Sequence, residues 1–318
     1  MLDHATFLRA IGDNPADDGP RLVYADWLEE QGETARAEFI RVQCELARLA
    51  PRRRGRGRLR DRQKRLLATH RHEWLGDVCA MVRVVGALSD ETRWESLYVS
   101  GRDAVVAFER GFVELVDMPV ETFVQHSAKI LRAASPGDLR ITGQLHRYTA
   151  RSQGNRLAAI LASELRGIRP HSLGLTFCPM ATKSWRTLLR SGGLSRLRRL
   201  KLAACALGNE ILPAIASSRR LAALEELHIA SNPITDEGLF ALAESSRLGE
   251  LRVLRINESR YYEAYSLAGL IELAESPRLP KLAEIHVAGN IREPQVDFFH
   301  RRFGRRVRLI ADADDIPF

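Results

Sequence analysis

LSRLRRLKLAACAL (194–207), LAALEELHIASNPI (221–234), LGELRVLRINESRY (248–261) and LPKLAEIHVAGNIR (279–292) are four versions of one phrase. Each begins with leucines three residues apart and closes with an apolar-x-apolar pair, which is followed shortly by Cys or Asn. The middle apolar positions are Leu200, Leu227 and Leu254, spaced 27 and 27 apart, and Ile285 follows after 31. A strand and helix of this size cannot bury their apolar faces alone, so neighbouring units must stack.

The phrase has the form L-x-x-L-x-L-x-x-N/C-x-L, which is the signature of leucine-rich repeats. The 27-residue length and the TDEGLFALA segment at 235–243 resemble the ribonuclease-inhibitor-like class of these repeats. The resemblance implies an α/β solenoid with a parallel concave sheet and helices on the convex side. Leu173 lies 27 residues before Leu200, so the regular array begins before its clearest rows.

Three regions are predicted along the chain. Residues 1–50 form a helical domain, residues 51–87 a basic linker and helix, and residues 88–318 the solenoid. Within the solenoid, residues 88–170 are degenerate repeats, 171–290 are regular and 291–318 form a C-terminal cap.

The N-terminal region reads as three helices. Asp3 is expected to cap the first, Pro20 to open the second, and residues 34–49 to form the third, while Leu22, Val23 and Trp27 are expected in a core. The phrases RLVYADWLEE (21–30) and RAEFIRVQ (36–43) resemble the bacterial repeat-companion domain, a short helical module that precedes repeats. This resemblance implies a bacterial protein and partner binding, and it carries over no catalytic residue.

The composition is that of a globular protein, with 45% apolar and 28% charged residues. No run of eighteen apolar residues is present, so no membrane span is expected. The N-terminus lacks the pattern of a signal peptide, and the four cysteines show no disulfide-framework spacing. The prediction is a cytoplasmic protein with reduced thiols that is monomeric by itself.

The net charge of +8 is concentrated in one segment. Residues 52–65 hold nine basic residues and one Asp, so the rest of the chain sums to zero. The first half of this segment is expected to be a loop, with a helix resuming at Leu59. It is either a solvated surface or a contact for a polyanion such as nucleic acid, and the candidate contacts are Arg52, Arg53, Arg54, Arg56, Arg58 and Arg60.

Motifs for catalysis, cofactor binding and metal binding are not found in the sequence. Cys178 and Cys205 occupy the N/C position of the repeat phrase, where a buried structural role is expected. His70, His72 and Cys79 match no zinc motif. The prediction is therefore a protein that is not an enzyme and has no cofactor or metal site.

The repeat phrase also predicts a surface. Its leucines enter the core, so the residues between them face the concave side because side chains alternate along a strand. The predicted partner-binding residues are Arg199, Lys201, Glu226, His228, Arg255, Asn257, Glu284 and His286. His228 and His286 are expected to strengthen the binding of acidic groups at mildly acidic pH.

A second predicted contact is the insertion after the row at 248–261. It carries Tyr261, Tyr262 and Tyr265, a residue type enriched at binding hot spots; packing of these rings against the solenoid is the alternative. The predicted function is a non-catalytic scaffold that binds a protein partner on the concave face. The alternative is a nucleic-acid-binding accessory protein that acts through residues 52–65.

Overall fold

A computed structural model describes residues 3–14, 17–50, 53–85, 104–143, 151–256, 265–287, 291 and 293–311. The chain divides into two compact units. The first comprises Met1–Val116 with Arg132–Ser135, and the second comprises Asp117–Leu131 with Pro136–Phe318. The predicted domain boundaries stay predictions, because compact packing does not by itself define a folding domain.

The first unit begins with the helices expected from the sequence, and they are α1 (His4–Asp13), α2 (Gly19–Glu30), α3 (Thr34–Arg48) and α4 (Arg56–Leu75). The Asp3 carboxylate caps α1 by accepting a hydrogen bond from the Thr6 amide at 2.8 Å, and Pro20 lies in the first turn of α2. The Asp3 cap prediction is confirmed, whereas Pro20, which was predicted to be the first residue of the second helix, is its second residue because α2 already begins at Gly19. The expected loop before Leu59 is shorter than predicted, because α4 already begins at Arg56.

An aromatic and aliphatic core holds α1, α2 and α3 together. Phe7 and Tyr24 are buried in it, and the Tyr24 and Trp27 rings stack with centroids 5.9 Å apart. Val23 was expected in this core, and that prediction is wrong, because its side chain is 54% exposed. The buried stripe of α2 instead runs through Tyr24, Ala25 and Leu28, and Val23 falls outside it.

The first unit also contains the first strands of a ten-stranded sheet. After η1 (Gly76–Ala80), β1 (Val82–Val85) pairs in parallel with β2 (Ala104–Glu109). β3 (Phe112–Pro119) follows β2 after only Arg110 and Gly111, which have φ values of 52° and 91°. Two central residues with positive φ define the tight turn of an antiparallel hairpin.

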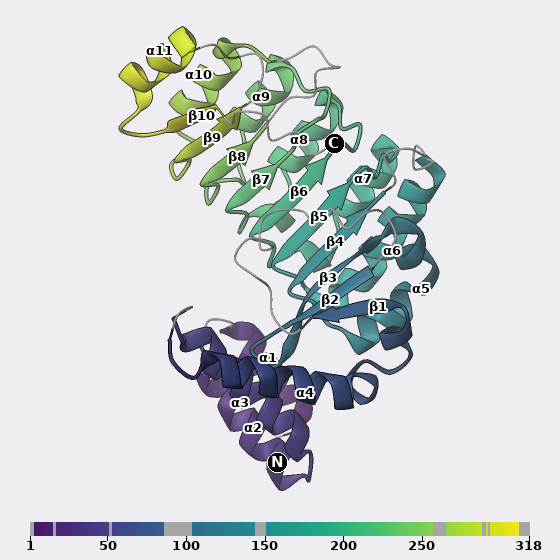
Figure 1. Ribbon diagram of the computed structural model, residues 1–318. Helices are drawn as coiled ribbons and strands as arrows, with labels where there is room; N and C mark the ends of the chain where they lie inside the picture. The colour runs from purple at the N-terminus through teal and green to yellow at the C-terminus, as the bar shows by residue number, and fades with distance from the viewer. Residues whose placement is uncertain are drawn as a thin grey trace. The chain divides into compact units, whose positions relative to one another are not determined.

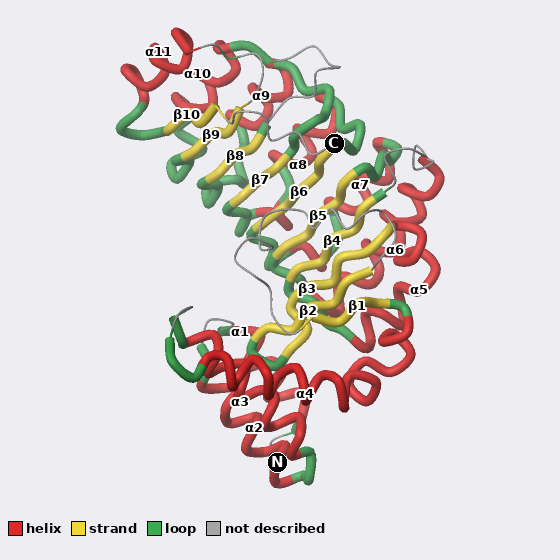
Figure 2. Tube along the Cα trace, in the orientation of Figure 1, coloured by secondary structure: helices red, strands yellow, loops and turns green. Residues whose placement is uncertain are grey.

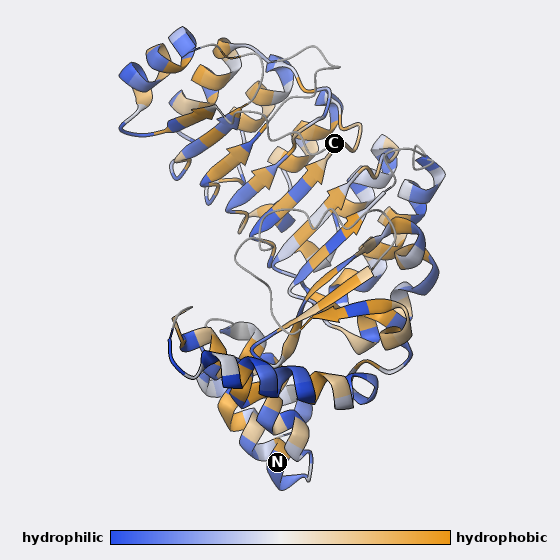
Figure 3. Cartoon of the chain, viewed as in Figure 1, coloured by the Kyte–Doolittle hydropathy of each residue, from blue (hydrophilic) through white to orange (hydrophobic). Residues whose placement is uncertain are grey.

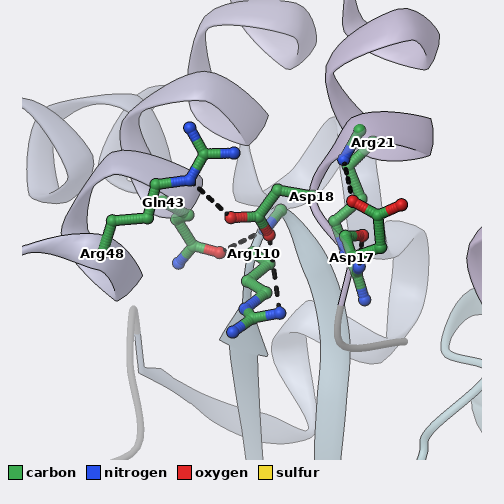
Figure 4. A network of polar contacts seen from close by, with 8 residues as sticks. Asp17, Asp18, Arg21, Gln43, Arg48 and Arg110 are labelled. Carbon is green, nitrogen blue, oxygen red and sulfur yellow. Dashed lines mark hydrogen bonds and ion pairs between the residues drawn. The ribbon is translucent and has the colours of Figure 1, made fainter. Parts of the chain in front are cut away.

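A polar network ties this hairpin turn to α2 and α3 (Figure 4). The buried Asp18 carboxylate accepts from Arg48 Nε at 2.9 Å and lies 3.5 Å from Arg110 Nη1. Gln43 Oε1 accepts from the Gly111 amide at 2.5 Å. Gly111 also lies directly against α3, since a Cβ added there would be 2.4 Å from Ile40 Cγ1. The turn therefore requires glycine both for its backbone angle and for space.

The second unit alternates strands and helices, as Figures 1 and 2 show. It contains the end of β3, α5 (Val120–Ala133), β4 (Asp138–Thr142), α6 (Arg151–Ile168), β5 (Ser172–Thr176), α7 (Thr182–Leu189), η3 (Gly192–Leu194), β6 (Arg199–Ala203), η4 (Asn209–Ile211), α8 (Leu212–Ala216), η5 (Arg219–Leu221), β7 (Glu226–His228), α9 (Asp236–Ala243), β8 (Val253–Arg255), α10 (Leu267–Glu275), β9 (Glu284–Val287), α11 (Glu293–Phe303) and β10 (Arg308–Ala311). From β4 to β10 the neighbouring strands pair in sequence order and in parallel.

The repeat spacing sets the strand register. Leu173 pairs with Leu200, Leu200 with Leu227, and Leu227 with Leu254, and these leucines are at most 3% exposed. The helices of the unit lie on one side of these strands (Figure 2), so the leucines pack against them. The intervening residues are only partly buried in β6, β7 and β8, whereas in β5 they are buried as well. Figure 3 shows the corresponding hydrophilic and hydrophobic bands along the strands.

In four repeats, a serine that follows the helix links that repeat to the preceding one. The Oγ atoms of Ser191, Ser218, Ser245 and Ser276 donate to backbone carbonyls 29 to 33 residues earlier, at 2.5 to 3.2 Å. Each hydroxyl also accepts a bond from a backbone amide of its own turn. These serines therefore satisfy backbone groups that stacking removes from water.

We expect Gly111→Ala to lower the free energy of unfolding by at least about 2 kcal/mol, because the new methyl group adds a collision with Ile40 to a positive φ. Gly32→Ala is the matched control. Gly32 has a φ of 84° but no atom within 4 Å of the position that a Cβ would occupy, so it reports backbone strain alone. Urea unfolding of both variants measures the difference; equal losses of stability would contradict the close packing on α3.

Candidate functional site

The sheet face without described helices carries two rows of side chains. The strand registers define a middle row of Arg140, Gly174, Lys201, His228, Arg255 and His286. They also define an outer row of Asp138, Ser172, Arg199, Glu226, Val253, Glu284 and Arg308. Because adjacent strands lie about 4.8 Å apart, neighbours within a row can contact one another or a shared ligand.

The structure brings together most of the residues predicted for the concave face. All of them except Asn257 lie in the two rows, and Asn257 is outside the described residues, as are Tyr261 and Tyr262. Tyr265 was predicted in the binding loop, but its side chain is only 4% exposed. It therefore belongs to the packing at the start of α10, and an exposed binding role for it is wrong.

Three charged residues at the β3–β4 end of this face were missed by the sequence analysis. Arg140 donates from Nε and Nη2 to Asp138 Oδ2 at 3.1 and 2.7 Å, while the buried Asp138 Oδ1 has no hydrogen-bond partner among the described residues. Asp117 is 8% exposed. Burial raises its pKa to about 6, an effect that the Arg140 charge opposes and the Asp138 charge reinforces.

A sequence signal existed for two of these residues. Arg140 stands between Leu139 and Ile141 as Lys201 stands between Leu200 and Leu202, so extending the middle row one repeat upstream finds Arg140 and Asp138. The signal is weak because the repeat is stretched there to 34 residues. Asp117 lies in β3, whose flanking hairpin breaks the repeat pattern, and no spacing rule identifies it.

His228 departs from its expected behaviour. Burial and the nearby Lys201, Arg255 and His286 lower its pKa to about 3. The imidazole is therefore neutral at mildly acidic pH in the free protein, and the predicted gain in binding between neutral and mildly acidic pH is wrong for His228. His286 is buried and bonds through Nδ1 to Arg255 Nη1 at 3.1 Å.

The outer row carries acids as well as bases. Burial raises the pKa of Glu226, against the opposing charges of Arg199 and Arg255. Arg308 bonds to Glu284 Oε1, and Arg199 Nη2 contacts His171 Nε2 at 3.1 Å. This face of the sheet is thus a mixed-charge surface in which the middle row is the more basic part.

The basic segment of the first unit separates into two groups. Arg56 donates to the carbonyl oxygens of Leu46 and Leu49 at the end of α3, and Arg62 donates two bonds to Glu38. These two arginines hold α4 on α3. Arg52 is outside the described residues, whereas the other predicted polyanion contacts are exposed, and these are Arg53, Arg54, Arg58 and Arg60.

The repeat cysteines have the expected structural role. The Cys178 thiol donates to the carbonyls of Ile141 and Thr176, and the Cys205 thiol to those of Leu175 and Ala203. Burial raises the pKa of Cys205 to about 12 and that of Cys178 well above its usual range. A thiol that stays protonated is a poor nucleophile.

Asn232 takes the same position one repeat later. Its side-chain oxygen accepts from the amides of Cys205 and Leu207, and the two N–H groups of its nitrogen lie within hydrogen-bonding distance of the carbonyls of Leu202, Ile229 and Ala230. Cys205 and Asn232 therefore perform the same task of satisfying buried backbone groups after a strand.

A family model described as Leucine Rich repeat matches residues 223–243, which contain β7 and α9. No curated protein matches the chain by sequence. The match and the parallel strands support a leucine-rich-repeat protein, and the predicted α/β solenoid preceded by a helical region is confirmed. Within the described part of the chain, no helix is long and apolar enough to cross a membrane.

We expect Asp117→Asn to stabilise the protein at neutral pH. The folded-state pKa of about 6 lies above the ordinary value of 3.8, so the folded protein binds the proton more tightly than the unfolded chain does. The free energy of unfolding therefore falls as pH rises from about 4 to about 6. Urea unfolding should show the variant more stable by about 1–3 kcal/mol at pH 7.

The difference between Asp117→Asn and the wild type should disappear below about pH 4. Glu244→Gln, a substitution of an exposed carboxylate, should change stability little at either pH. A wild type that is more stable than Asp117→Asn at pH 7 would refute the unfavourable burial of this charge.

Proposed function

We propose that this protein is a non-catalytic scaffold that binds a protein partner on the concave face. The observation that carries the proposal is the double row of mostly polar and charged side chains on parallel strands, on the face opposite the helices of the second unit. Leucine-rich repeats generally mediate protein–protein interaction. The buried, protonated cysteines support a role without nucleophilic catalysis.

The helical first unit fits a repeat-companion module in this proposal. The two phrases that carry the resemblance contribute Arg21, Tyr24 and Gln43, and these residues serve packing or the network around the hairpin turn. Arg21 is itself largely buried, and burial lowers the pKa of its guanidinium. We infer that the phrases specify how this module folds and do not form a reactive site.

The concave-face proposal predicts that Arg199→Ala, Glu226→Ala and Arg255→Ala together weaken capture of the native partner at least about tenfold, because interface charges contribute to affinity and partner choice. The control is alanine at Lys183, Arg190 and Glu244, which are exposed residues on the helical side of the second unit. Quantitative pull-down from the native cell measures both. Capture that is lost only in the control would place binding on the convex side.

A second candidate function is nucleic-acid binding through α4. Figure 3 shows α4 as hydrophilic over most of its length. Arg56 and Arg62 of α4 are occupied by their bonds to the α3 region. The exposed basic residues that remain on α4 are Arg58, Arg60, Lys64, Arg65 and Arg71, and the exposed acidic residues are Asp61 and Glu73. A basic helix face of this kind attracts a phosphate backbone.

For this candidate we expect duplex DNA or RNA binding that weakens steeply with salt. Glutamine at Arg58, Arg60, Lys64 and Arg65 should reduce the slope of log K against log salt concentration by about 0.9 for each phosphate that the protein no longer neutralises. Glutamine at the exposed residues Lys183, Arg190, Arg219 and Arg247 removes the same charge from the second unit. Equal weakening in both variants would indicate a nonspecific charge effect, and absence of binding would eliminate the candidate.

A further inference from the structure

Two polar side chains of the middle row stand unpaired within the described ranges. Lys201 and His228 lie opposite each other on β6 and β7, and both are partly buried. Neither forms a hydrogen bond or ion pair with any residue that the structure describes. Both side chains therefore keep hydrogen-bonding groups that no described residue occupies, and these groups are available to a ligand.

The surroundings of the pair favour an anion. On one side, Gly174 has no side chain, and the Arg140 side chain extends over it, with Cγ 3.4 Å from the position a Cβ would occupy. On the other side lies Arg255. Burial, Arg140 and Arg255 lower the pKa of the Lys201 ammonium group, and together they outweigh Asp117 and Asp138, which raise it. An anion placed here would offset both the desolvation and the repulsion of these charges.

The carboxylates around Lys201 and His228 limit which kind of anion can bind there. Glu226 and Glu284 stand in the outer row beside His228 and His286, and Asp117 and Asp138 stand near Lys201. A nucleic-acid backbone carries closely spaced phosphates, so its neighbouring charges would meet these carboxylates. An isolated carboxylate on a peptide can reach the middle row without that repulsion.

We propose that the partner of the concave face presents an aspartate or glutamate side chain of an acidic peptide segment to Lys201 Nζ and to an imidazole N–H of His228, with Arg255 beside it. This inference rests on the proposed concave-face function and names the chemistry that the partner must carry. The ammonium and the neutral imidazole both donate, and the carboxylate has acceptor sites for both. Bonds of this charge-assisted kind are among the stronger ones in proteins.

The test selects random displayed peptides on the full-length protein and measures the affinities of the enriched peptides. We expect aspartate or glutamate at one fixed position, a large loss of affinity when that residue becomes asparagine or glutamine, and at least about tenfold weaker binding to Lys201→Met and to His228→Ala. Lys183→Met is the control, since Lys183 is an exposed lysine on α7, and it should bind like the wild type.

Other outcomes overturn the inference in distinguishable ways. Enriched peptides without an acidic position that still require Arg199 or Glu226 would retain the concave-face function and reject the acidic partner. Peptides that bind independently of both rows, or no enriched peptides at all, would count against the acidic partner, and the native pull-down separately tests the function. Displacement of bound acidic peptide by random duplex DNA at physiological salt would favour a nucleic acid on this face.

Discussion

The second unit depends on stacking successive strand–helix repeats while keeping every buried backbone group hydrogen-bonded. Asn232 illustrates the requirement, since one side chain lies within hydrogen-bonding distance of five backbone groups of its own repeat and of the preceding one. The serines on the helical side do the same at the opposite end of the repeat. An unsatisfied buried amide or carbonyl costs about 1–3 kcal/mol. Polar residues at two fixed positions are therefore as necessary to this array as its leucines.

The same requirement explains the state of the two repeat cysteines. Cys178 and Cys205 use their thiols for backbone carbonyls and remain protonated, so they belong to the scaffold. The side chains of the two rows on the sheet have no such task, and several of them interact with one another. Arg140 and Asp138 pair, as do Arg308 and Glu284, whereas Lys201 and His228 find no partner in the part of the chain that the structure describes.

In the first unit the controlling constraint is a close approach of backbone to helix. Gly111 contacts Ile40 of α3, and its amide bonds to Gln43, while Asp18 holds Arg110. A buried charge such as that of Asp18 is unfavourable unless it is paired. The network therefore stabilises the arrangement in which the hairpin turn lies against α2 and α3. Arg56 and Arg62 act likewise between α3 and α4. Part of the charge run between residues 52 and 65 is therefore structural.

The sequence alone determined the repeat register, the buried leucines and the two rows between them, because side-chain alternation in strands and a fixed period leave only one arrangement of parallel neighbours. It also predicted the N-terminal helices and the structural role of the repeat cysteines. Asp117, the neutral state of His228, the burial of Tyr265 and the exposure of Val23 required the tertiary structure. Each depends on which groups far apart in the chain surround the side chain and on how much water they exclude. Periodicity specifies the direction of a side chain, whereas its charge state and its partners depend on its three-dimensional environment.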